Sequence, residues 1–208
     1  MKTSEQAHNF NQVVVLTAEE PTNFKSIFSV EKKYLPQALE MSQVFQQAIN
    51  HKTLEFDFDK ALQLVQEHTE MAVVGTINQT IQQSTAQVSA MVDKLKALLK
   101  TILMATLQPQ QEAQYSEAIT QAFTNLAPQE GNAWIFWKSE EAHKTTYQYN
   151  ILFAIQNKST GSVMAALPIG LTIEVNIDKK QVLFITIKDQ HEYNVQVKAI
   201  TVVEALKG

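Results

Sequence analysis

The sequence predicts an α+β fold, with helical hairpins packed on one mostly antiparallel sheet. Apolar residues recur at helical spacing up to about Gly131 and mostly alternate after it, which separates helices from strands along the chain. The turns after Gly131 are short and polar, and short connections favour antiparallel neighbours. A length of 208 residues with 45% hydrophobic residues suits one compact domain.

The chain up to Gly131 predicts one short strand and two helical hairpins. The strand, residues 12–17, contains three consecutive valines, a run typical of a strand covered on both faces. The first helix begins around Tyr34, and the second begins near Asp57 or Asp59, because either carboxylate can accept a backbone N–H as the N-cap. Their apolar stripes are Leu35, Leu39, Ser42, Phe45 and Ile49 in the first helix and Ala61, Leu62 and Val65 in the second.

An ambiguous segment precedes the second hairpin. Residues 73–77 favour a strand, whereas Ile77, Ile81 and Val88 keep a helical spacing, so we expect a helix only from about Gln79. This third helix ends before Pro109, and a fourth spans about 111–126. The apolar stripe of the third helix is Val88, Met91, Val92, Leu95, Leu98, Leu99, Ile102 and Leu103.

Five strands are expected after Gly131, separated by polar or glycine-containing turns. Pro168 and Gly170 should bulge or break the third of them, because proline cannot donate to a β-ladder. The expected strands span residues 133–138, 145–157, 162–177, 181–188 and 192–203.

Composition excludes several classes of function. All 17 basic residues are lysines against 21 acidic ones, and a net charge of -4 without arginine argues against a nucleic-acid partner. The absence of cysteine excludes disulfides, thiolate metal sites and cysteine nucleophiles. The N-terminal residues lack the apolar core of a secretory signal, and no stretch reaches the ~20 apolar residues of a membrane-spanning helix. We expect a protein made in the cytoplasm without a signal peptide.

No motif for catalysis, metal binding or cofactor binding stands out. The histidines are too far apart for a His-x-x-x-His pair, and Glu140 with His143 gives a Glu-x-x-His spacing only once, in a loop. Asp57 and Asp59 are better explained as a helix cap than as paired acid and base. The isolated glycines match no phosphate-binding loop, and no serine lies in a Gly-x-Ser-x-Gly elbow. We expect no catalytic residue, no metal and no cofactor.

The later strands alternate between an apolar and a polar side. A membrane β-strand needs ~9 to 11 residues of such alternation, but a soluble antiparallel sheet with one buried face shows the same pattern. The candidate membrane-inserting residues on the apolar side are Tyr147, Tyr149, Ile151, Phe153, Ile155, Leu171, Ile173, Val175, Leu183, Ile185, Ile187, Val195 and Val197.

The number and order of several short motifs resemble the cytolytic delta-endotoxins, the Cyt toxins of insect-pathogenic bacteria. The similarity extends over almost the whole chain, and none of the motifs is a catalytic signature. They include Thr22-Asn23-Phe24, Gly75-Thr76-Ile77-Asn78-Gln79, Phe123-Thr124-Asn125-Leu126, Trp134-Ile135 with Trp137, Ile151-Leu152-Phe153, Leu167-Pro168-Ile169, Leu183-Phe184-Ile185-Thr186-Ile187-Lys188-Asp189 and Thr201-Val202-Val203.

The resemblance implies a single three-layer α/β/α domain, in which two helical hairpins wrap the sheet, and a toxin that is not an enzyme. It implies direct phospholipid binding, homo-oligomerisation on the membrane with the helical layers moving away and sheet strands inserting, and cooperation with other toxins. The toxin would be released to the extracellular space and act at a target-cell membrane. We expect residues 1–11 to form a flexible tail, 12–130 the first strand and the helical hairpins, and 131–206 the main sheet strands.

Two features depart from the family pattern. Family protoxins usually carry a longer C-terminal extension that proteolysis removes, whereas this sequence ends at Gly208, which leaves only the N-terminal tail to clip. The acidic balance means that attraction to anionic lipid is not the main affinity term, since each basic residue near such a surface gives only ~1 kcal/mol. Zwitterionic lipid should therefore suffice.

Two alternatives stay open. The amphipathic helices could enter or lie on the membrane, with Leu95, Leu98, Leu99, Ile102 and Leu103 facing lipid. Alternatively, the chain could be a soluble protein that binds an apolar or carbohydrate ligand in a cleft between sheet and helices. The aromatic residues that would serve such a site are Trp134, Phe136, Trp137, Tyr147 and Tyr149.

Overall fold

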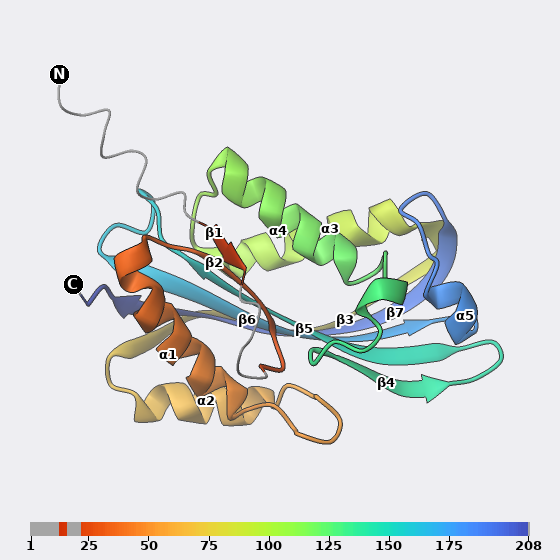
Figure 1. Ribbon diagram of the computed structural model, residues 1–208, viewed down its shortest axis with the longest axis horizontal. Coiled ribbons are helices and arrows are strands. Elements are labelled where there is room, and N and C mark those ends of the chain that lie inside the picture. The colour runs from red at the N-terminus through yellow and green to blue at the C-terminus, as the bar shows by residue number, and fades with distance from the viewer. Residues whose placement is uncertain (1–12, 16–21, 208) are drawn as a thin grey trace.

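The computed structural model describes residues 13–15 and 22–207, which form one sheet with helices on both faces (Figure 1). Seven strands have the order β1-β2-β5-β6-β7-β3, and β4 pairs with β5 off this path. Among the described strands, only β2 and β5 are parallel neighbours, and the other pairs are antiparallel. The strands are β1 (Val13–Val15), β2 (Lys25–Ser29), β3 (Met71–Gln87), β4 (Ile135–Glu140), β5 (Thr145–Ile155), β6 (Val163–Val175) and β7 (Gln190–Ala205).

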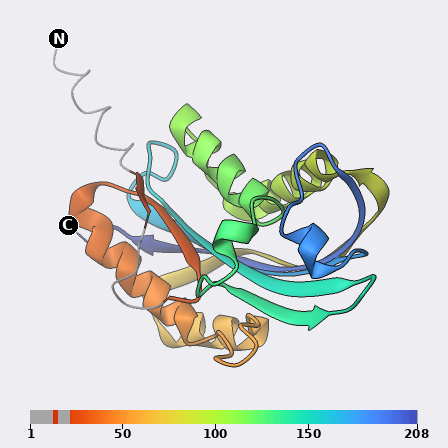
Figure 2. The same cartoon turned by 45° about the vertical axis from the view of Figure 1, so that its right-hand side comes forward.

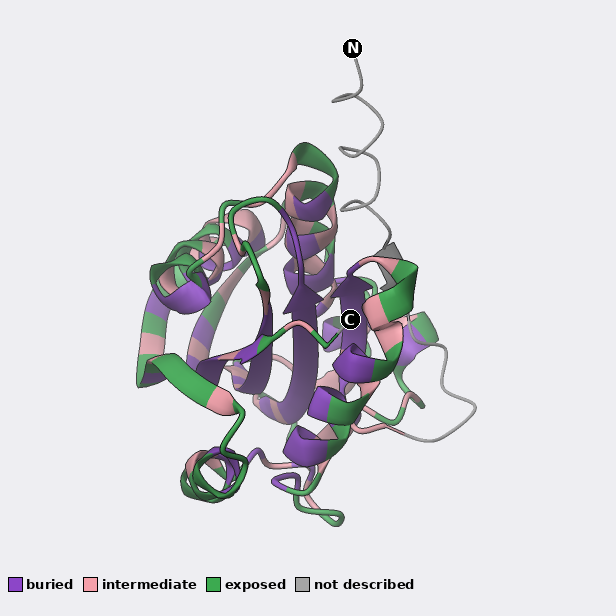
Figure 3. Cartoon of the chain, turned by 90° about the vertical axis from the view of Figure 1, so that its left-hand side faces the viewer, coloured by how far each residue is buried: buried purple, intermediate pink, exposed green. Residues whose placement is uncertain are grey.

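Two helical hairpins cover the two faces of the sheet, which confirms the predicted α+β class (Figure 2). The first hairpin is α1 (Leu35–Gln46) and α2 (Phe58–Glu67), and the second is α3 (Val88–Leu103) and α4 (Pro109–Gln121). Buried residues line the sheet and the inward side of each helix (Figure 3). The side chain of Asp57 accepts a hydrogen bond from the Lys60 N–H at 3.0 Å, so the predicted cap of α2 is confirmed.

Part of the N-terminal region lies outside the described residues. Of the first predicted strand, residues 12–17, only Val13–Val15 lies within the described residues, where it pairs with β2. The expected flexible tail, residues 1–11, lies outside them.

The expectation of a helix from about Gln79 is wrong, because β3 continues as a strand to Gln87 and α3 begins only at Val88. A spacing of four residues is an even number, so Ile77 and Ile81 share one side of a strand as well as one side of a helix. Their cross-strand partners in β7 are Ala199 and Val195. Polar residues on both faces of the strand, among them Thr76, Asn78, Gln79 and Thr80, obscure the alternation that marks a strand.

The expected break at Pro168 and Gly170 is also wrong, because β6 stays in one register with both neighbours. The ladder to β7 simply has no paired partners at Leu167 and Pro168, which accommodates the missing N–H without a bulge. Gly170 is required for a different reason. A Cβ at this position would lie 2.5 Å from the Cβ of Phe56, in the segment between α1 and α2.

The strand expected over 181–188 does not form. This segment begins within the short helix α5 (Lys179–Val182) and continues as irregular chain, and β6 pairs directly with β7. Asp178 accepts a hydrogen bond from the Gln181 N–H at 2.9 Å and so caps α5. The two remaining short helical turns are η2 (Lys32–Tyr34) and η3 (Ala127–Gln129).

We expect Gly170→Ala to lower the free energy of unfolding by about 1 to 3 kcal/mol, because the added Cβ overlaps Phe56 and neither Cβ can rotate away. Urea unfolding followed by circular dichroism measures the change. Gly131→Ala is the matched control, since nothing lies within 4 Å of its added Cβ. Equal stability of the two variants would contradict the close approach of Phe56 to β6.

One lysine is partly buried between the sheet and a helix. Lys25 of β2 donates to the side-chain carbonyl of Gln121 on α4. Burial lowers the pKa of Lys25 from 10.5 to about 8, and the charge of Glu117 offsets part of this shift. The unfolded chain therefore binds the proton more tightly than the folded protein, and the folded state gains stability as the pH rises from about 8 to 10.5.

We expect Lys25→Met to raise stability at pH 7 and to flatten the pH dependence of stability between pH 8 and 10.5, because it removes the cost of burying an ammonium group. Unfolding by urea at several pH values measures both effects. Lys60→Met, at an exposed position of α2, should leave the slope unchanged. A slope that Lys25→Met does not alter would show that this lysine is not the linked group.

Candidate membrane-inserting face

The candidate inserting residues on β5, β6 and β7 share one side of the sheet. Each is at most 3% exposed, and all belong to the core formed with α3 and α4. They are Tyr147, Tyr149, Ile151, Phe153, Ile155, Leu171, Ile173, Val175, Val195 and Val197. Leu183, Ile185 and Ile187 pack against the same core from the irregular segment after α5. The structure thus places these residues in one apolar layer, but three of them are not on strands.

The other side of the same strands changes character along their length. At one end it is apolar and packs against α1 and α2, through residues that include Leu152, Ala154, Ala166, Ile200 and Val202. At the other end it is polar, with Thr146, Gln148, Asn150, Thr172, Glu174, Asn194 and Gln196. The strands are therefore amphipathic only at the end where α1 and α2 do not cover them.

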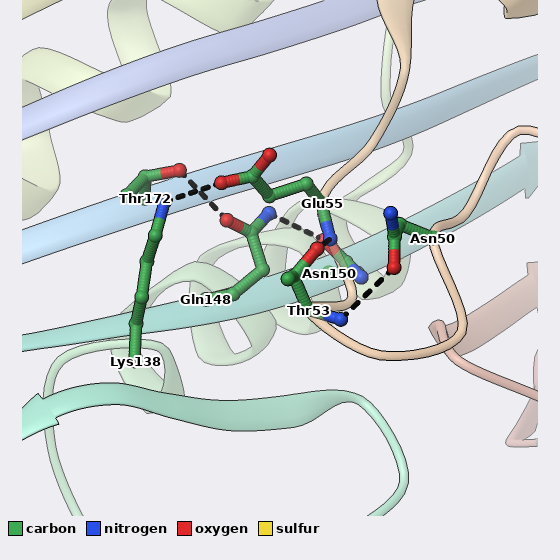
Figure 4. Close-up of polar contacts among 7 residues, drawn as sticks. All are labelled: Asn50, Thr53, Glu55, Lys138, Gln148, Asn150 and Thr172. Atoms are coloured by element: carbon green, nitrogen blue, oxygen red, sulfur yellow. Dashed lines mark hydrogen bonds and ion pairs between the residues drawn. The ribbon is translucent and has the colours of Figure 1, made fainter.

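Buried amides tie the polar end to the segment between α1 and α2 (Figure 4). The Thr172 hydroxyl donates to the Gln148 side-chain carbonyl at 2.7 Å, and the Gln148 amide donates to Asn150 Oδ1 at 2.9 Å. The Asn150 amide in turn donates to the Leu54 carbonyl at 2.8 Å. Because Asn150 and Gln148 are buried, this network satisfies groups that would otherwise cost stability.

Two tyrosine hydroxyls hold the end of α4 on the sheet. Tyr147 donates to the Ala122 carbonyl and Tyr149 donates to Gln129 Oε1, both at 2.6 Å. The Gln129 amide donates to the carbonyls of Gln121 and Asn125, each at 3.0 Å. Burial raises the pKa of both tyrosines, so the hydroxyls remain protonated donors. Sequence reasoning treated these tyrosines as apolar and missed these contacts.

A second polar cluster fixes the tip of the α3–α4 hairpin. The Asn157 amide, just after β5, donates to Gln111 Oε1 at 2.8 Å and to the Thr106 carbonyl at 2.7 Å. The Gln111 amide donates to Ser29 Oγ at 2.7 Å, and the Thr106 N–H donates to Ser159 Oγ at 2.9 Å. The hairpin is thus attached to the turn between β5 and β6.

The base of the hairpin is attached to the segment after α5. The first N–H groups of α3 receive no side-chain cap; those of Val88 and Ser89 donate to the carbonyls of Asp189 at 2.9 Å and Ile187 at 3.1 Å. The Ala127 N–H donates to the Leu183 carbonyl at 3.1 Å. Beside these contacts, Phe184 is 73% exposed at a groove of about 530 Å³ next to the end of α4.

The residues of the two alternative hypotheses are also part of the core. Leu95, Leu99, Ile102 and Leu103 are buried against the sheet, and Leu98 is partly buried. The five aromatic residues are divided between the two helical layers. Trp134, Trp137, Tyr147 and Tyr149 lie on the α3–α4 side, with the Trp137 and Tyr147 rings 5.1 Å apart, and Phe136 packs on the α1–α2 side. They do not surround one shared cleft.

One sequence candidate for metal binding, Glu140, takes part in an ion pair. Glu140 pairs with Lys179 at 2.7 Å, at the end of β4. Residues 13–15 and 22–207 contain no group of three or more histidine or carboxylate side chains placed to hold a metal. Within the same residues, every helix is too short or too polar to cross a membrane.

Comparisons with known proteins agree with this architecture. The family model described as Bacillus thuringiensis toxin matches residues 4–208. The chain is 43% identical over 195 residues to the type-2Aa cytolytic delta-endotoxin of Bacillus thuringiensis subsp. kyushuensis, covering 93% of this chain and 75% of that protein. It is 43% identical over 186 residues to the type-2Ba cytolytic delta-endotoxin of Bacillus thuringiensis subsp. israelensis, covering 89% of this chain and 71% of that protein.

Solved structures give the same result. The crystal structure of the activated Cyt2Ba monomer from Bacillus thuringiensis subsp. israelensis superposes with a TM-score of 0.88 at 44% identity, over 90% of this chain and 100% of that chain. A structure described as a delta-endotoxin superposes with a TM-score of 0.89 at 42% identity, over 94% of this chain and 88% of that chain. The sequence match, the two helical hairpins and the shared sheet together show that this chain belongs to the Bacillus thuringiensis toxin family of cytolytic delta-endotoxins.

Proposed function

We propose that this cytolytic toxin binds phospholipid directly, releases the α3–α4 hairpin from the sheet, and inserts β5, β6 and β7 into the bilayer as an oligomer. One observation carries the proposal. A continuous apolar face on three adjacent strands is covered by a helical hairpin that meets the sheet through apolar packing and a few polar contacts. Removing that hairpin would expose a surface that lipid can cover in its place.

The length and pairing of these strands support insertion. β5, β6 and β7 have 11, 13 and 16 residues, whereas a strand needs about 9 to 11 to cross the hydrocarbon region. The strands keep their mutual backbone hydrogen bonds when a helical layer leaves, and lipid accepts a backbone only when those bonds are satisfied. The polar end of the opposite face, which includes Thr172 and Gln196, would then line water.

The α3–α4 hairpin is suited to leave as a unit. Its two helices pack on each other, and the Tyr115 hydroxyl on α4 donates to the Lys96 carbonyl on α3 at 2.8 Å. Its polar attachments to the sheet are gathered at the tip, at the base of α3 and at the end of α4. A hairpin held at three places can detach without unfolding internally.

Neutral lipid should be sufficient for this activity, because a chain with a net charge of -4 gains little from an anionic surface. Dye release from phosphatidylcholine vesicles therefore tests the proposal directly. A folded protein that releases no dye from these vesicles, at any protein-to-lipid ratio, would contradict receptor-independent action on neutral lipid.

A disulfide at the hairpin tip tests whether the hairpin must leave. Thr106 and Ser159 are exposed and in hydrogen-bond contact, and the chain has no native cysteine. We expect oxidised Thr106→Cys/Ser159→Cys to release little dye and the reduced form to regain the activity of the parent, because the bond keeps the apolar face covered. Vesicle dye release before and after reduction measures this.

The two single-cysteine variants are the controls and should be insensitive to oxidation at low protein concentration. Equal dye release by the oxidised and reduced double variant would argue that the tip of the α3–α4 hairpin need not move. Circular dichroism of each form establishes that the soluble fold is the same.

The tyrosine contact offers a second test of the same movement. We expect Tyr147→Phe to lower the free energy of unfolding by about 1 kcal/mol and to speed dye release, because it removes a bond from the sheet to α4 and keeps the face apolar. Tyr115→Phe is the matched control: it removes a bond inside the hairpin. If both variants changed the rate of dye release equally, the effect would come from general destabilisation.

A further inference from the structure

The strand β3 forms a long open edge of the sheet. It spans 17 residues, and among the described residues β7 is its only partner strand. Figure 3 shows it at the left margin of the sheet, where much of its surface is exposed. An edge of this length presents a row of backbone N–H and C=O groups with which another strand can pair.

This edge lacks the usual protection against pairing. Natural edge strands carry lysine, proline or inward-pointing charges, or are kept very short. Residues 71–87 contain no charged residue and no proline. The two irregularities in its pairing lie near its ends, so the nine residues Gly75 to Gln83 run in one unbroken register with β7. The exposed side chains along this part are uncharged: Thr76, Asn78, Gln79, Thr80 and Gln82.

Within residues 13–15 and 22–207, the opposite edge of the sheet offers no matching strand. It is formed by β1, β2 and β4, which have three, five and six residues. β4 also carries Lys138 and Glu140, which form ion pairs with Glu55 and Lys179. Of the open strand edges in the described part of the chain, only that of another β3 is this long and free of charge.

We propose that two copies of this chain join antiparallel along β3 in the assembly that forms on a membrane. The inference rests on the proposed function, because it names the surface at which the oligomer is built. In water, solvent satisfies the open edge; in lipid, unpaired backbone groups cost several kcal/mol each, so pairing becomes strongly favoured there. The nine regular residues match the ~9 to 11 that a strand needs to cross the hydrocarbon region.

Single cysteines along β3 test the pairing, because the chain has none of its own. Thr76→Cys, Thr80→Cys and Ser84→Cys replace exposed residues of the strand, and Gln63→Cys on the exposed side of α2 is the matched control. Each variant is added to phosphatidylcholine vesicles, oxidised, and examined for disulfide dimers on a non-reducing gel. Dye release is recorded on the same samples.

We expect one β3 position to give dimers about tenfold above the Gln63→Cys control, since pairing holds the two thiols at a high effective concentration. Antiparallel pairing has a further signature. In an antiparallel pair of two β3 strands, a position before the centre of the pairing faces a position after it. Two such positions should therefore cross-link better in a mixture of the two variants than in either variant alone.

A second variant tests the same edge without cysteine chemistry. Thr80→Lys places a charge on the open strand, as natural edges do, and should suppress both dimer formation and dye release. Gln63→Lys, which adds the same charge on α2, should retain both.

The outcomes separate the two proposals. Dye release without β3 dimers above the control would overturn the pairing and leave the proposed function standing. The same conclusion would follow if the β3 cysteines formed cross-links with Ser139→Cys on β4 and not with β3 of another copy. Undiminished lysis by Thr80→Lys would also overturn the pairing. No dye release by the parent chain would instead contradict the proposed function, and the membrane assembly of β3 with it.

Discussion

The apolar face of β5, β6 and β7 needs a cover in water, and the α3–α4 hairpin supplies it. The residues of this face are almost completely buried, and much of the second half of the chain contributes to it. Burying apolar area at about 25 cal/mol per Å² makes this layer the main source of stability, while the tyrosine and amide contacts determine where the hairpin sits. At Gly75, where a Cβ would lie 2.7 Å from the Cβ of Ile102, α3 and β3 approach as closely as their backbones allow.

The need to cover apolar strands in water also explains why the two helical hairpins differ in what their loss would expose. The α1–α2 hairpin covers the apolar end of the opposite face, and the segment between its two helices reaches the polar end, where the buried Asn150 amide donates to the Leu54 carbonyl. The α3–α4 hairpin covers strands whose other side is polar at the uncovered end. Loss of α3 and α4 would therefore leave an amphipathic sheet, whereas loss of α1 and α2 would expose strands that are apolar on both sides.

Residue patterns were sufficient for the fold class, for the helical stripes and for a cap at Asp57 or Asp59, of which the structure uses Asp57, because each depends on neighbours in sequence. They failed at β3, where a spacing of four fits both a helix and a strand, and at 181–188, where alternation suggested a strand but Asp178 starts a helix. The apolar face could be found from alternation alone. The polar attachments of this face could not be found from the sequence. The hydroxyls of Tyr147 and Tyr149 bond to Ala122 and Gln129, which are distant in sequence, and no local pattern predicts these contacts.

The position of the tyrosines along the strands has a consequence for the orientation of an inserted sheet. Tyr147 and Tyr149 lie near the start of β5, and Tyr193 lies near the start of β7, which runs in the same direction as β5, in the same core. Tyr147 pairs with Ile173 and Tyr193 with Val175, near the end of the intervening strand β6. Tyrosine favours the boundary between lipid headgroups and acyl chains, where its ring is shielded and its hydroxyl is wet. In an inserted sheet these three rings would hold this end at the level of the headgroups. The opposite end would then enter the bilayer first.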